Sequence, residues 1–539
     1  QEARASWFSH KAEQALPHYY RVYLADYDTT VEVTPTERAA LFRVTYPQTD
    51  QAYVVIDAFD KGSYIKVLPE QRKVVGWTTR NSGGVPATFK NYFVLVFDQP
   101  FVSACVWKDK ELKEGILELQ DNHVGALVQF KAAARGDRVN FRAASSFISP
   151  EQAELNLKEL GSDSFDAVCA KGRQAWNQAL GRITVEGGTL DQYRTFYTCL
   201  YRSLLFPRAF WETDASGKPV HYSPHTGEVK PGYYYTDSGF WDTFRSLFPL
   251  LNFLYPSVNA KMTAGLEACY RESGWLPEWA SPGHRGCMVG NNSASVVADA
   301  WLSGARGGYD IGMLYEAVVH GAENAHPTIQ SVGRAGAKEY LELGYVPRDI
   351  GINESAARTL EYAYDDWCAW KLAVDLKRPQ AEIDRFAQRC QNYRKLFNPE
   401  KKLMCGRNKD GSFDKDFNPF KWGGDFTEGN SLHYTWSVFH DVQGLIGLMG
   451  GRQAFAAKLD EVFALPPVFD ESYYKQVIHE IREMQIMNFG QYAHGNQPIQ
   501  HMIYLYAYAG EPWKSQRWVR EVMNRLYTPA PDEIGRAHV

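Results

Sequence analysis

The sequence predicts a two-part α+β protein, with a β-sandwich in the first part of the chain and a large all-helical domain after it. Two patterns carry this prediction. Short runs of alternating apolar and polar residues, separated by turn residues, occupy residues 19–147 and are typical of antiparallel strands. From residue 188 onward, apolar residues recur at the three- and four-residue spacing of amphipathic helices. An apolar fraction of 45% over 539 residues supplies a core for each part.

Composition excludes several classes of protein. The formal net charge is −5, so no basic excess favours nucleic acid. No apolar run approaches the roughly 18 residues that a membrane-spanning helix needs. The eight cysteines show no CxxC spacing and indicate neither a zinc site nor a disulfide framework. Aromatic residues reach 14%, which suits stacking on sugar rings as well as a large core.

The first part, residues 1–148, is predicted to be the sandwich. Turn residues such as those at 60–62, 82–84 and 135–137 separate its apolar runs. The expected strands are residues 20–24, 30–34, 41–44, 53–56, 92–97, 126–130 and 139–141.

A helical connector is expected at residues 149–187. Ser149 is a candidate N-cap and Pro150 suits the first helical position, so one helix begins there and a second follows at 163–181. The helical domain then occupies residues 188–532.

The helical domain is predicted to contain about eleven helices. So many helices exceed a simple bundle, and antiparallel pairs that close into an α/α toroid are the natural arrangement. We look for chemistry in the long polar loops at 207–240, 275–290, 406–431 and 484–497. The expected helices are 189–206, 241–254, 256–273, 291–305, 308–324, 354–376, 380–396, 432–449, 451–463, 498–509 and 512–526.

Two of these loops end in candidate sugar contacts. Trp241 offers a stacking face, Asp242 can accept hydrogen bonds from sugar hydroxyls, and Arg245 one turn later would keep Asp242 ionised. Trp279 and Asn291 come from the next loop and the turn after it. The alternatives are structural: Asp242 complements a helix dipole, Trp279 pins its loop to the core, and the turn at 290–293 caps a helix.

The remaining two loops contain a candidate acid and candidate metal ligands. Glu428 lies between a glycine-rich loop and an aromatic segment, where desolvation would raise its pKa as a general acid requires. Alternatively, Thr427 caps a helix and Glu428 only complements its dipole. His494, Asn496 and Gln497 precede a predicted helix, and the two amide oxygens would suit Ca²⁺. Simple capping is the alternative. No GxSxG, P-loop or GxGxxG pattern is present.

Together, these motifs resemble glycoside hydrolase family 92, the calcium-dependent exo-acting α-mannosidases, over nearly the whole chain. The residues that carry the resemblance are 9–13, 241–245, 427–430, 495–498 and 504–514. It implies a β-sandwich packed on an (α/α)6 toroid and hydrolysis with inversion.

The resemblance also implies roles for individual residues. It places the general acid at Glu428, mannose contacts at Trp241 and Asp242, and polar or calcium-adjacent groups at His494, Asn496 and Gln497. Some family members carry Glu at the position of Gln497. The implied substrate is a mannose-containing glycan with a terminal, α-1,2-linked mannose. The implied location is periplasmic, secreted or on the cell surface.

Both ends of the chain depart from the family pattern. The family's opening sandwich strands should precede residue 1, and its general-base aspartates should lie just after Asp532. Residues 533–539 back-translate to a sequencing-adapter read-through, so we expect a non-native tail, a missing last toroid helix and an inactive or nearly inactive chain. If the chain is active, the base is to be sought among Asp237, Glu278, Glu354 and Asp425.

Two other functions stay open at this point. Another (α/α)6 glycoside hydrolase or a phosphorylase would share the fold, but a phosphorylase needs a basic phosphate pocket, and no loop gathers several Arg or Lys residues. A non-catalytic mannose-binding protein would bind mannose without turnover.

Overall fold

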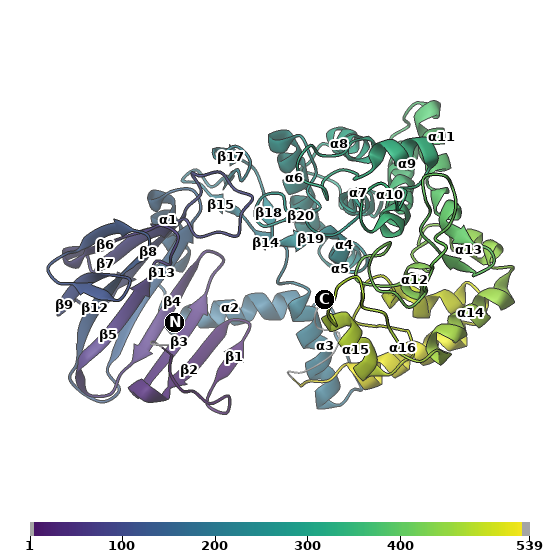
Figure 1. Ribbon diagram of the computed structural model, residues 1–539. Coiled ribbons are helices and arrows are strands. Elements are labelled where there is room, and N and C mark those ends of the chain that lie inside the picture. The colour runs from purple at the N-terminus through teal and green to yellow at the C-terminus, as the bar shows by residue number, and fades with distance from the viewer. Residues whose placement is uncertain (1–4, 531–539) are drawn as a thin grey trace. The chain divides into compact units, whose positions relative to one another are not determined.

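The computed structural model describes residues 5–530 and divides into two compact units (Figure 1). Unit 1 consists of Gln1–Thr184 and Phe210–Tyr233, and unit 2 of Val185–Ala209 and Tyr234–Val539. These boundaries differ from the predicted ones in two ways. The predicted connector belongs to the β-rich unit, and so does the later segment Phe210–Tyr233. The suspected tail, 533–539, lies outside the described residues.

Unit 1 contains two antiparallel sheets of nine and four strands. The alternating runs of the sequence form strands as predicted, and further strands occur at 63–68, 73–78 and 103–108, where none was assigned. The nine-stranded sheet has the order β1 (Gln14–Leu16), β2 (Tyr19–Leu24), β3 (Thr29–Pro35), β4 (Ala39–Thr45), β13 (Arg138–Ser146), β8 (Asn91–Phe97), β7 (Lys73–Thr78), β6 (Ser63–Leu68) and β11 (Glu118–Asp121). The four-stranded sheet has the order β10 (Glu111–Lys113), β9 (Ser103–Lys108), β12 (Val124–Ala132) and β5 (Thr49–Asp57).

The core of unit 1 lies between these sheets. Strand β13 pairs with β4 and β8, so that Phe141 lies opposite both Phe42 and Phe97. The Phe42 and Phe141 rings stack with centroids 4.6 Å apart. Ile65 and Val128, one from each sheet, are fully buried in the same cluster. The period-two pattern therefore buries one face of each sheet.

Two helices cover the other face of the nine-stranded sheet. They are α1 (Pro150–Asn156), which contacts β8 and β13, and α2 (Phe165–Leu180), which contacts β3 and β4. Ser149 Oγ accepts the Gln152 N–H at 3.1 Å, which confirms the predicted N-cap.

The returning segment is anchored to unit 1 by a buried carboxylate. It forms the small sheet of β15 (Trp211–Thr213), β16 (Pro219–Tyr222) and β17 (Val229–Pro231). Glu212 accepts hydrogen bonds from Ser146 Oγ at 3.0 Å and Asn156 Nδ2 at 2.7 Å. Burial raises the pKa of Glu212, and these hydrogen bonds partly offset the increase.

Unit 2 is helical and differs from the predicted elements in several places. The expected helix at 432–449 is two helices, α12 and α13, and the expected helix at 380–396 is α11 followed by a 3-10 helix at Asn392–Leu396. The expected helix at 241–254 is two helices because the backbone leaves the helical region at Ser246, where φ is −142°. The expected helix at 498–509 is the 3-10 helix η6 (Gln500–Ala507). Helices α9 and α15 were not predicted. The α-helices are α3 (Leu190–Arg202), α4 (Phe240–Thr243), α5 (Leu247–Leu254), α6 (Pro256–Ser273), α7 (Ser293–Leu302), α8 (Ile311–Glu323), α9 (Ala337–Leu343), α10 (Ser355–Asp375), α11 (Gln380–Arg389), α12 (Ser431–Tyr434), α13 (Val442–Leu448), α14 (Arg452–Ala464), α15 (His479–Met487) and α16 (Pro512–Leu526).

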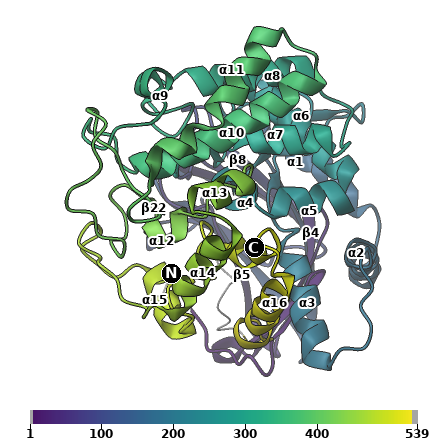
Figure 2. The same ribbon diagram turned by 90° about the vertical axis from the view of Figure 1, so that its right-hand side faces the viewer.

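Helix α10 lies among α7, α8 and α11 in unit 2 (Figure 2). It contacts α7, α8 and α11, and most of its residues are buried. Closure of the helices into six pairs remains a prediction. Within residues 5–530, no helix is both long enough and apolar enough to cross a bilayer.

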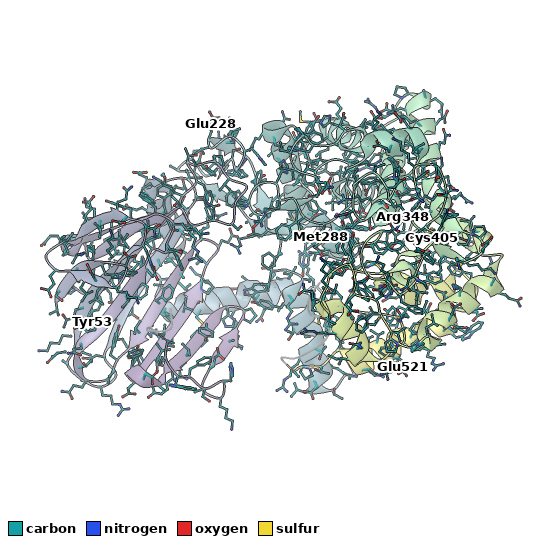
Figure 3. All side chains as sticks on the ribbon, viewed as in Figure 1. Tyr53, Glu228, Met288, Arg348, Cys405 and Glu521 are labelled. Carbon is teal, nitrogen blue, oxygen red and sulfur yellow. The ribbon has the colours of Figure 1, made fainter. Side chains whose placement is uncertain are left out.

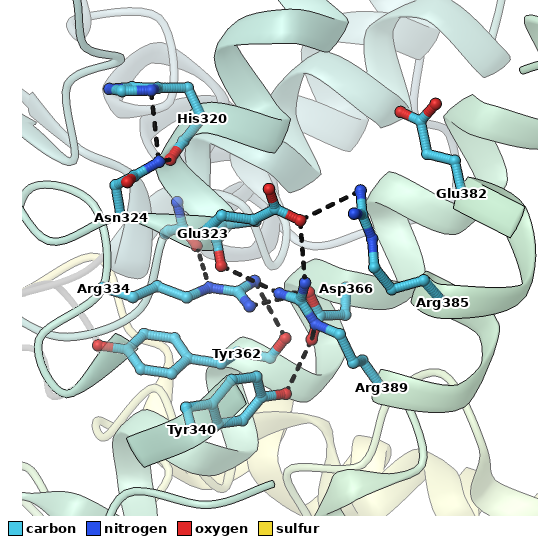
Figure 4. Close-up of polar contacts among 12 residues, drawn as sticks. His320, Glu323, Asn324, Arg334, Tyr340, Tyr362, Asp366, Glu382, Arg385 and Arg389 are labelled. Carbon is cyan, nitrogen blue, oxygen red and sulfur yellow. Dashed lines mark hydrogen bonds and ion pairs between the residues drawn. The ribbon is translucent and has the colours of Figure 1, made fainter. Parts of the chain in front are cut away.

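A buried charge cluster joins the helices around α10 (Figure 4). Arg334 and Asp366 have fully buried side chains and form an ion pair at 2.8 Å. Arg389 of α11 pairs with the same carboxylate at 2.8 Å, and Tyr340 Oη donates to it at 2.8 Å. The Asp366 carboxylate thus has three partners, from a loop and from two helices.

We predict that Arg334→Met destabilises unit 2 strongly. The substitution removes one of the two arginines paired with the buried Asp366 carboxylate and also the donor to Asn291 Oδ1, so we expect a loss of about 3–5 kcal/mol in the free energy of unfolding. Chemical denaturation monitored by circular dichroism measures it. The control is Arg385→Met, which removes a half-exposed arginine paired with Glu323 at 3.1 Å and should change the free energy by less than about 1 kcal/mol. Equal losses in the two variants would contradict this prediction.

Candidate active site

A short strand pairing brings two candidate residues together. Strand β19 (Ser238–Gly239) pairs with β20 (Trp279–Ala280), and Gly239 lies opposite Trp279. A Cβ at Gly239 would clash with both Trp279 Nε1 and Asp242 Oδ2. Only glycine allows so close an approach, so this position keeps the indole beside the carboxylate.

Asp242 lies in the first turn of α4 and is held by side-chain donors. Gln497 Nε2 donates to Asp242 Oδ1 at 2.7 Å, and the Trp279 indole also hydrogen-bonds the carboxylate. Burial raises the pKa of Asp242, while the charge of Arg245 and these two hydrogen bonds lower it. Asp242, Trp279 and Gln497, from three predicted loop clusters, therefore meet at one place.

The direct partner of Arg245 differs from the one predicted. Its guanidinium forms an ion pair with Glu361 at 3.1 Å, and the two side chains are 8% and 0% exposed. Its Nε also donates to the Trp241 carbonyl at 3.2 Å. The charge of Arg245 lowers the pKa of Asp242, while its guanidinium pairs with Glu361 of α10, which the sequence analysis missed.

Two predicted sugar contacts lie in the interior, and we correct them. Trp241 is 1% exposed and belongs to the main core cluster of unit 2, so its ring offers no open stacking face. Asn291 is 2% exposed. Its Oδ1 accepts from Arg334 Nε at 2.7 Å, and its N–H donates to Asp365 Oδ2 at 2.9 Å. Asn291 therefore belongs to the buried charge cluster.

All four alternative bases have polar partners in the structure, including Glu354, which pairs with Arg358 at 3.4 Å. Glu278 accepts the Ser293 N–H at 3.1 Å and Ser293 Oγ at 2.6 Å, so it caps the first turn of α7. Asp425 pairs with Arg348, labelled in Figure 3, at 3.1 Å. These bonds use the carboxylate oxygens that a base would need.

The other two alternatives differ from each other. Asp237 accepts from Ser281 Oγ at 2.9 Å and pairs with Arg208 at 3.3 Å. Glu354 is close enough for its negative charge to raise the pKa of Glu428. Of the four, Glu354 alone contributes to the electrostatic environment of the predicted acid.

Glu428 lies in the glycine-rich loop before α12 and is half-buried. The N-cap of α12 is Asn430, whose side chain accepts the His433 N–H at 3.2 Å. The expectation that Thr427 caps this helix is therefore wrong, and Glu428 lies before the N-cap.

The environment of Glu428 favours its protonated form. Burial, followed by the negative charges of Glu480, Asp242 and Glu354, raises the pKa of Glu428 to about 7. A carboxyl group with a pKa of about 7 is about half protonated at neutral pH, which matches the pKa that general acid catalysis favours.

Glu480 lies in the unpredicted helix α15 and is a residue that the sequence analysis missed. Ile481, Met484 and Met487 are buried at three-residue spacing along this helix. That spacing is the signal that would have revealed the helix and placed Glu480 in its first turn.

The segment at residues 494–497 contacts both candidate carboxyl groups. Asn496 Nδ2 donates to the Glu428 carbonyl at 2.6 Å, and Gln497 donates to Asp242 as described above. His494 lies between the hydroxyls of Tyr492, at 2.9 Å, and Tyr527, at 2.8 Å. Burial lowers the pKa of His494 to about 4, so its ring is neutral at physiological pH.

Buried oxygen atoms on this segment suit a hard cation. Asn496 Oδ1 is buried and has no hydrogen-bond partner among the described residues. Glu483 Oε2 is also buried without a hydrogen-bond partner among the described residues, and it lies against Gly495. Gln497 uses its nitrogen for Asp242, which leaves Oε1 as its potential ligand atom. Amide and carboxylate oxygens are ligands that Ca²⁺ prefers, and Zn²⁺ prefers nitrogen and sulfur.

Comparison with protein families agrees with this geometry. The model of the glycosyl hydrolase family 92 catalytic domain matches residues 152–535, and that of the family 92 N-terminal domain matches residues 1–146. The chain belongs to glycosyl hydrolase family 92. This confirms the resemblance seen in the sequence and the order of a β-rich domain followed by a helical one.

Solved structures of family 92 include close neighbours. The family 92 inverting mannosidase BT2199 from Bacteroides thetaiotaomicron is 45% identical, with a TM-score of 0.93, and the match covers 100% of this chain and 72% of that one. The α-mannosidase BT3965 from the same organism, in complex with mannoimidazole, is 31% identical, with a TM-score of 0.88 and coverage of 98% and 70%.

A curated relative has a more distant sequence. It is described as an uncharacterized secreted glycosidase from Arthroderma benhamiae and is 26% identical over 95% of this chain. The chain spans 66% of the length of that relative.

We predict that Gly239→Ala disrupts the contact between Trp279 and Asp242. The new methyl group must displace one of them, which should lower the free energy of unfolding by about 1–3 kcal/mol. Denaturation followed by tryptophan fluorescence measures the change. The matched control is Gly447→Ala in α13, where an added Cβ would have no neighbouring atom within 4 Å; it should be neutral or stabilise by about 0.4–1 kcal/mol. A neutral Gly239→Ala would show that glycine is not required there.

Proposed function

We propose that the protein is an exo-acting α-mannosidase that releases a terminal mannose from a glycan and inverts the anomeric centre. Family membership and the inverting mannosidase BT2199 support this proposal. The single observation that carries it is the half-buried Glu428, whose pKa is raised to about 7 by burial and by nearby carboxylates. Its surroundings prepare this group to donate a proton.

In the proposed mechanism, Glu428 protonates the glycosidic oxygen as the bond to the leaving group breaks. A general base activates water on the opposite face of the sugar, and in inverting enzymes the two carboxyl groups are about 6.5–9.5 Å apart to admit that water. The family resemblance places this base at an aspartate just after the position of Asp532, and residues 533–539 of this chain contain no aspartate.

Asp242 is proposed to accept hydrogen bonds from mannose hydroxyls. The Trp279 indole and Gln497 Nε2 fix the orientation of its carboxylate before any sugar binds. A carboxylate held in this way loses little conformational freedom on binding. The neutral ring of His494 offers one further polar group on the same segment.

A Ca²⁺ ion is proposed to bind beside these residues. Asn496 and Gln497 would hold it through their side-chain oxygens, and a bound cation would supply positive charge that polarises sugar hydroxyls or water. The α-1,2 linkage rests on the sequence resemblance. A periplasmic, secreted or cell-surface location is supported by the relative described as secreted.

Glu428→Gln in the full-length protein should lower kcat strongly on an α-1,2-mannobiose and much less on an activated aryl α-mannoside. A good leaving group departs without a proton, whereas an alkoxide needs one, and general acid catalysis contributes about 10²–10⁴-fold. Steady-state kinetics on both substrates measure the split. Glu342→Gln, an exposed glutamate in α9, is the matched control. Equal losses on both substrates would refute the general-acid role, and binding without turnover in the unmodified protein would indicate a mannose-binding protein.

The pH dependence should follow the proton on Glu428. The acid is active when protonated, and its pKa is raised to about 7, so kcat/KM on the mannobiose should fall tenfold per pH unit above about pH 7. An unperturbed glutamate, near 4.5, would already be ionised at that pH. Rates measured across this range show where the alkaline limb lies. If kcat/KM already begins to fall near pH 4.5, the proposed rise in the pKa of Glu428 is contradicted.

Exhaustive chelation should abolish activity of the full-length protein, and Ca²⁺ should restore it better than Zn²⁺ because the proposed ligands are oxygens. Calcium should also raise the melting temperature, since a ligand at 100 times its Kd stabilises the native state by about 2.7 kcal/mol. Asn496→Ala should lose this thermal response. Unchanged activity and melting temperature after chelation would remove the metal from the proposal.

A further inference from the structure

The backbone of Glu428 has an unusual conformation. Its φ is +48°, in the left-handed region. This region is unfavourable for a residue with a Cβ, and the native structure retains it only where the surroundings impose it. Glycines are available on either side, at Gly424 and Gly429, yet the left-handed position next to α12 is occupied by the glutamate itself.

Hydrogen bonds hold the peptide group before Glu428 at both ends. Tyr434 Oη donates to the Thr427 carbonyl at 2.9 Å. The Glu428 N–H, on the other side of the same peptide group, donates to Tyr474 Oη at 2.9 Å. Rotation of this peptide group would break both bonds.

The peptide group after Glu428 is also held. Its carbonyl accepts from Asn496 Nδ2 at 2.6 Å. One residue later, the Gly429 carbonyl accepts the Gly423 N–H at 3.0 Å and closes the loop. Both peptide groups that flank the Glu428 Cα are therefore fixed by groups outside any helix hydrogen-bond ladder.

Tyr474, which accepts the Glu428 N–H, lies in the connection between α14 and α15. Its neighbour Tyr473 packs against the other end of the loop, because a Cβ on Gly423 would clash with the Tyr473 ring. The two tyrosine rings are in edge contact, with centroids 5.0 Å apart. Residues 473 and 474 thus contact the loop at Gly423 and at Glu428.

We infer that Tyr474 is a positioning residue: its hydroxyl holds the Glu428 backbone in the left-handed conformation and so directs the carboxyl group toward the glycosidic oxygen. This inference rests on the proposed function. The direction of a side chain follows the φ and ψ of its own residue, so relaxation of the backbone toward the right-handed region moves the carboxyl group away from its target. A displacement of about 1 Å at a reacting group can reduce the rate by about 10²-fold.

The test is Tyr474→Phe in the full-length protein, which keeps the ring and removes the acceptor. We expect kcat on an α-1,2-mannobiose to fall about 10- to 100-fold, with little change in KM. The rate on an activated aryl α-mannoside should fall less than about threefold, because that leaving group needs no proton. Substitution Tyr474→O-methyltyrosine retains the acceptor oxygen without its proton and should restore most of the mannobiose rate.

The matched control is Tyr506→Phe. It removes a tyrosine hydroxyl that donates to Asp460 at 2.9 Å in the same unit, so a general loss of stability would appear in both variants. The ratio of the two substrate rates is measured on one sample and does not depend on the fraction that folds. A ratio in Tyr474→Phe equal to that of the unmodified protein would overturn the inference.

Failure of this inference and failure of the proposed function give different results. If Glu428→Gln shows the leaving-group split and Tyr474→Phe does not, Glu428 remains the acid and Tyr474 has no part in positioning it. If Glu428→Gln itself shows no split, the proposed general acid is wrong, whatever Tyr474→Phe does.

Discussion

The hydrogen bond from Gln497 to Asp242 joins segments that are 255 residues apart, and the candidate active site depends on it. On one side, Asp242 is fixed to Trp279 by the strand pairing at Gly239. On the other, the residue before Gln497 contacts the Glu428 backbone. Two adjacent amide side chains thus determine how the two carboxyl groups lie relative to each other.

Burial raises the pKa of both Asp242 and Glu428. The two groups differ in the hydrogen bonds and charges around them. Asp242 has the Trp279 indole, the Gln497 amide and the nearby charge of Arg245 to oppose the rise in its pKa. For Glu428, the charges of Glu480, Asp242 and Glu354 add to the effect of burial. Similar groups in one site therefore suit different roles, one as an acceptor of hydroxyl groups and one as a proton donor.

Sequence periodicity predicted the elements that local patterns determine. The alternating strands of unit 1, the long α10 and the Ser149 cap depend on spacing and on neighbouring residues. Family motifs placed Glu428, Asp242, Asn496 and Gln497 in one site, and the structure brings them together.

Long-range contacts decided the rest, and no local pattern reports them. Trp241 lies beneath the site instead of lining it, since the fold buries that side of α4. Asn291 accepts a hydrogen bond from Arg334, and Arg245 pairs with Glu361; both partners lie on distant segments. Helix α15 is the exception: its three-residue spacing is a local signal, but no capping side chain marks its start, so Glu480 was not associated with the proposed acid.

The side chain of Asn496 has a defined orientation because its two ends differ chemically. Its nitrogen donates to the Glu428 carbonyl, and its buried oxygen, at the other end of the amide, is the atom proposed to bind the cation. An aspartate would keep an oxygen on the cation side and lose the donor, while a leucine of similar size would lose both. The planar amide would thereby connect the proposed cation to the main chain of the proposed acid, over the length of one side chain.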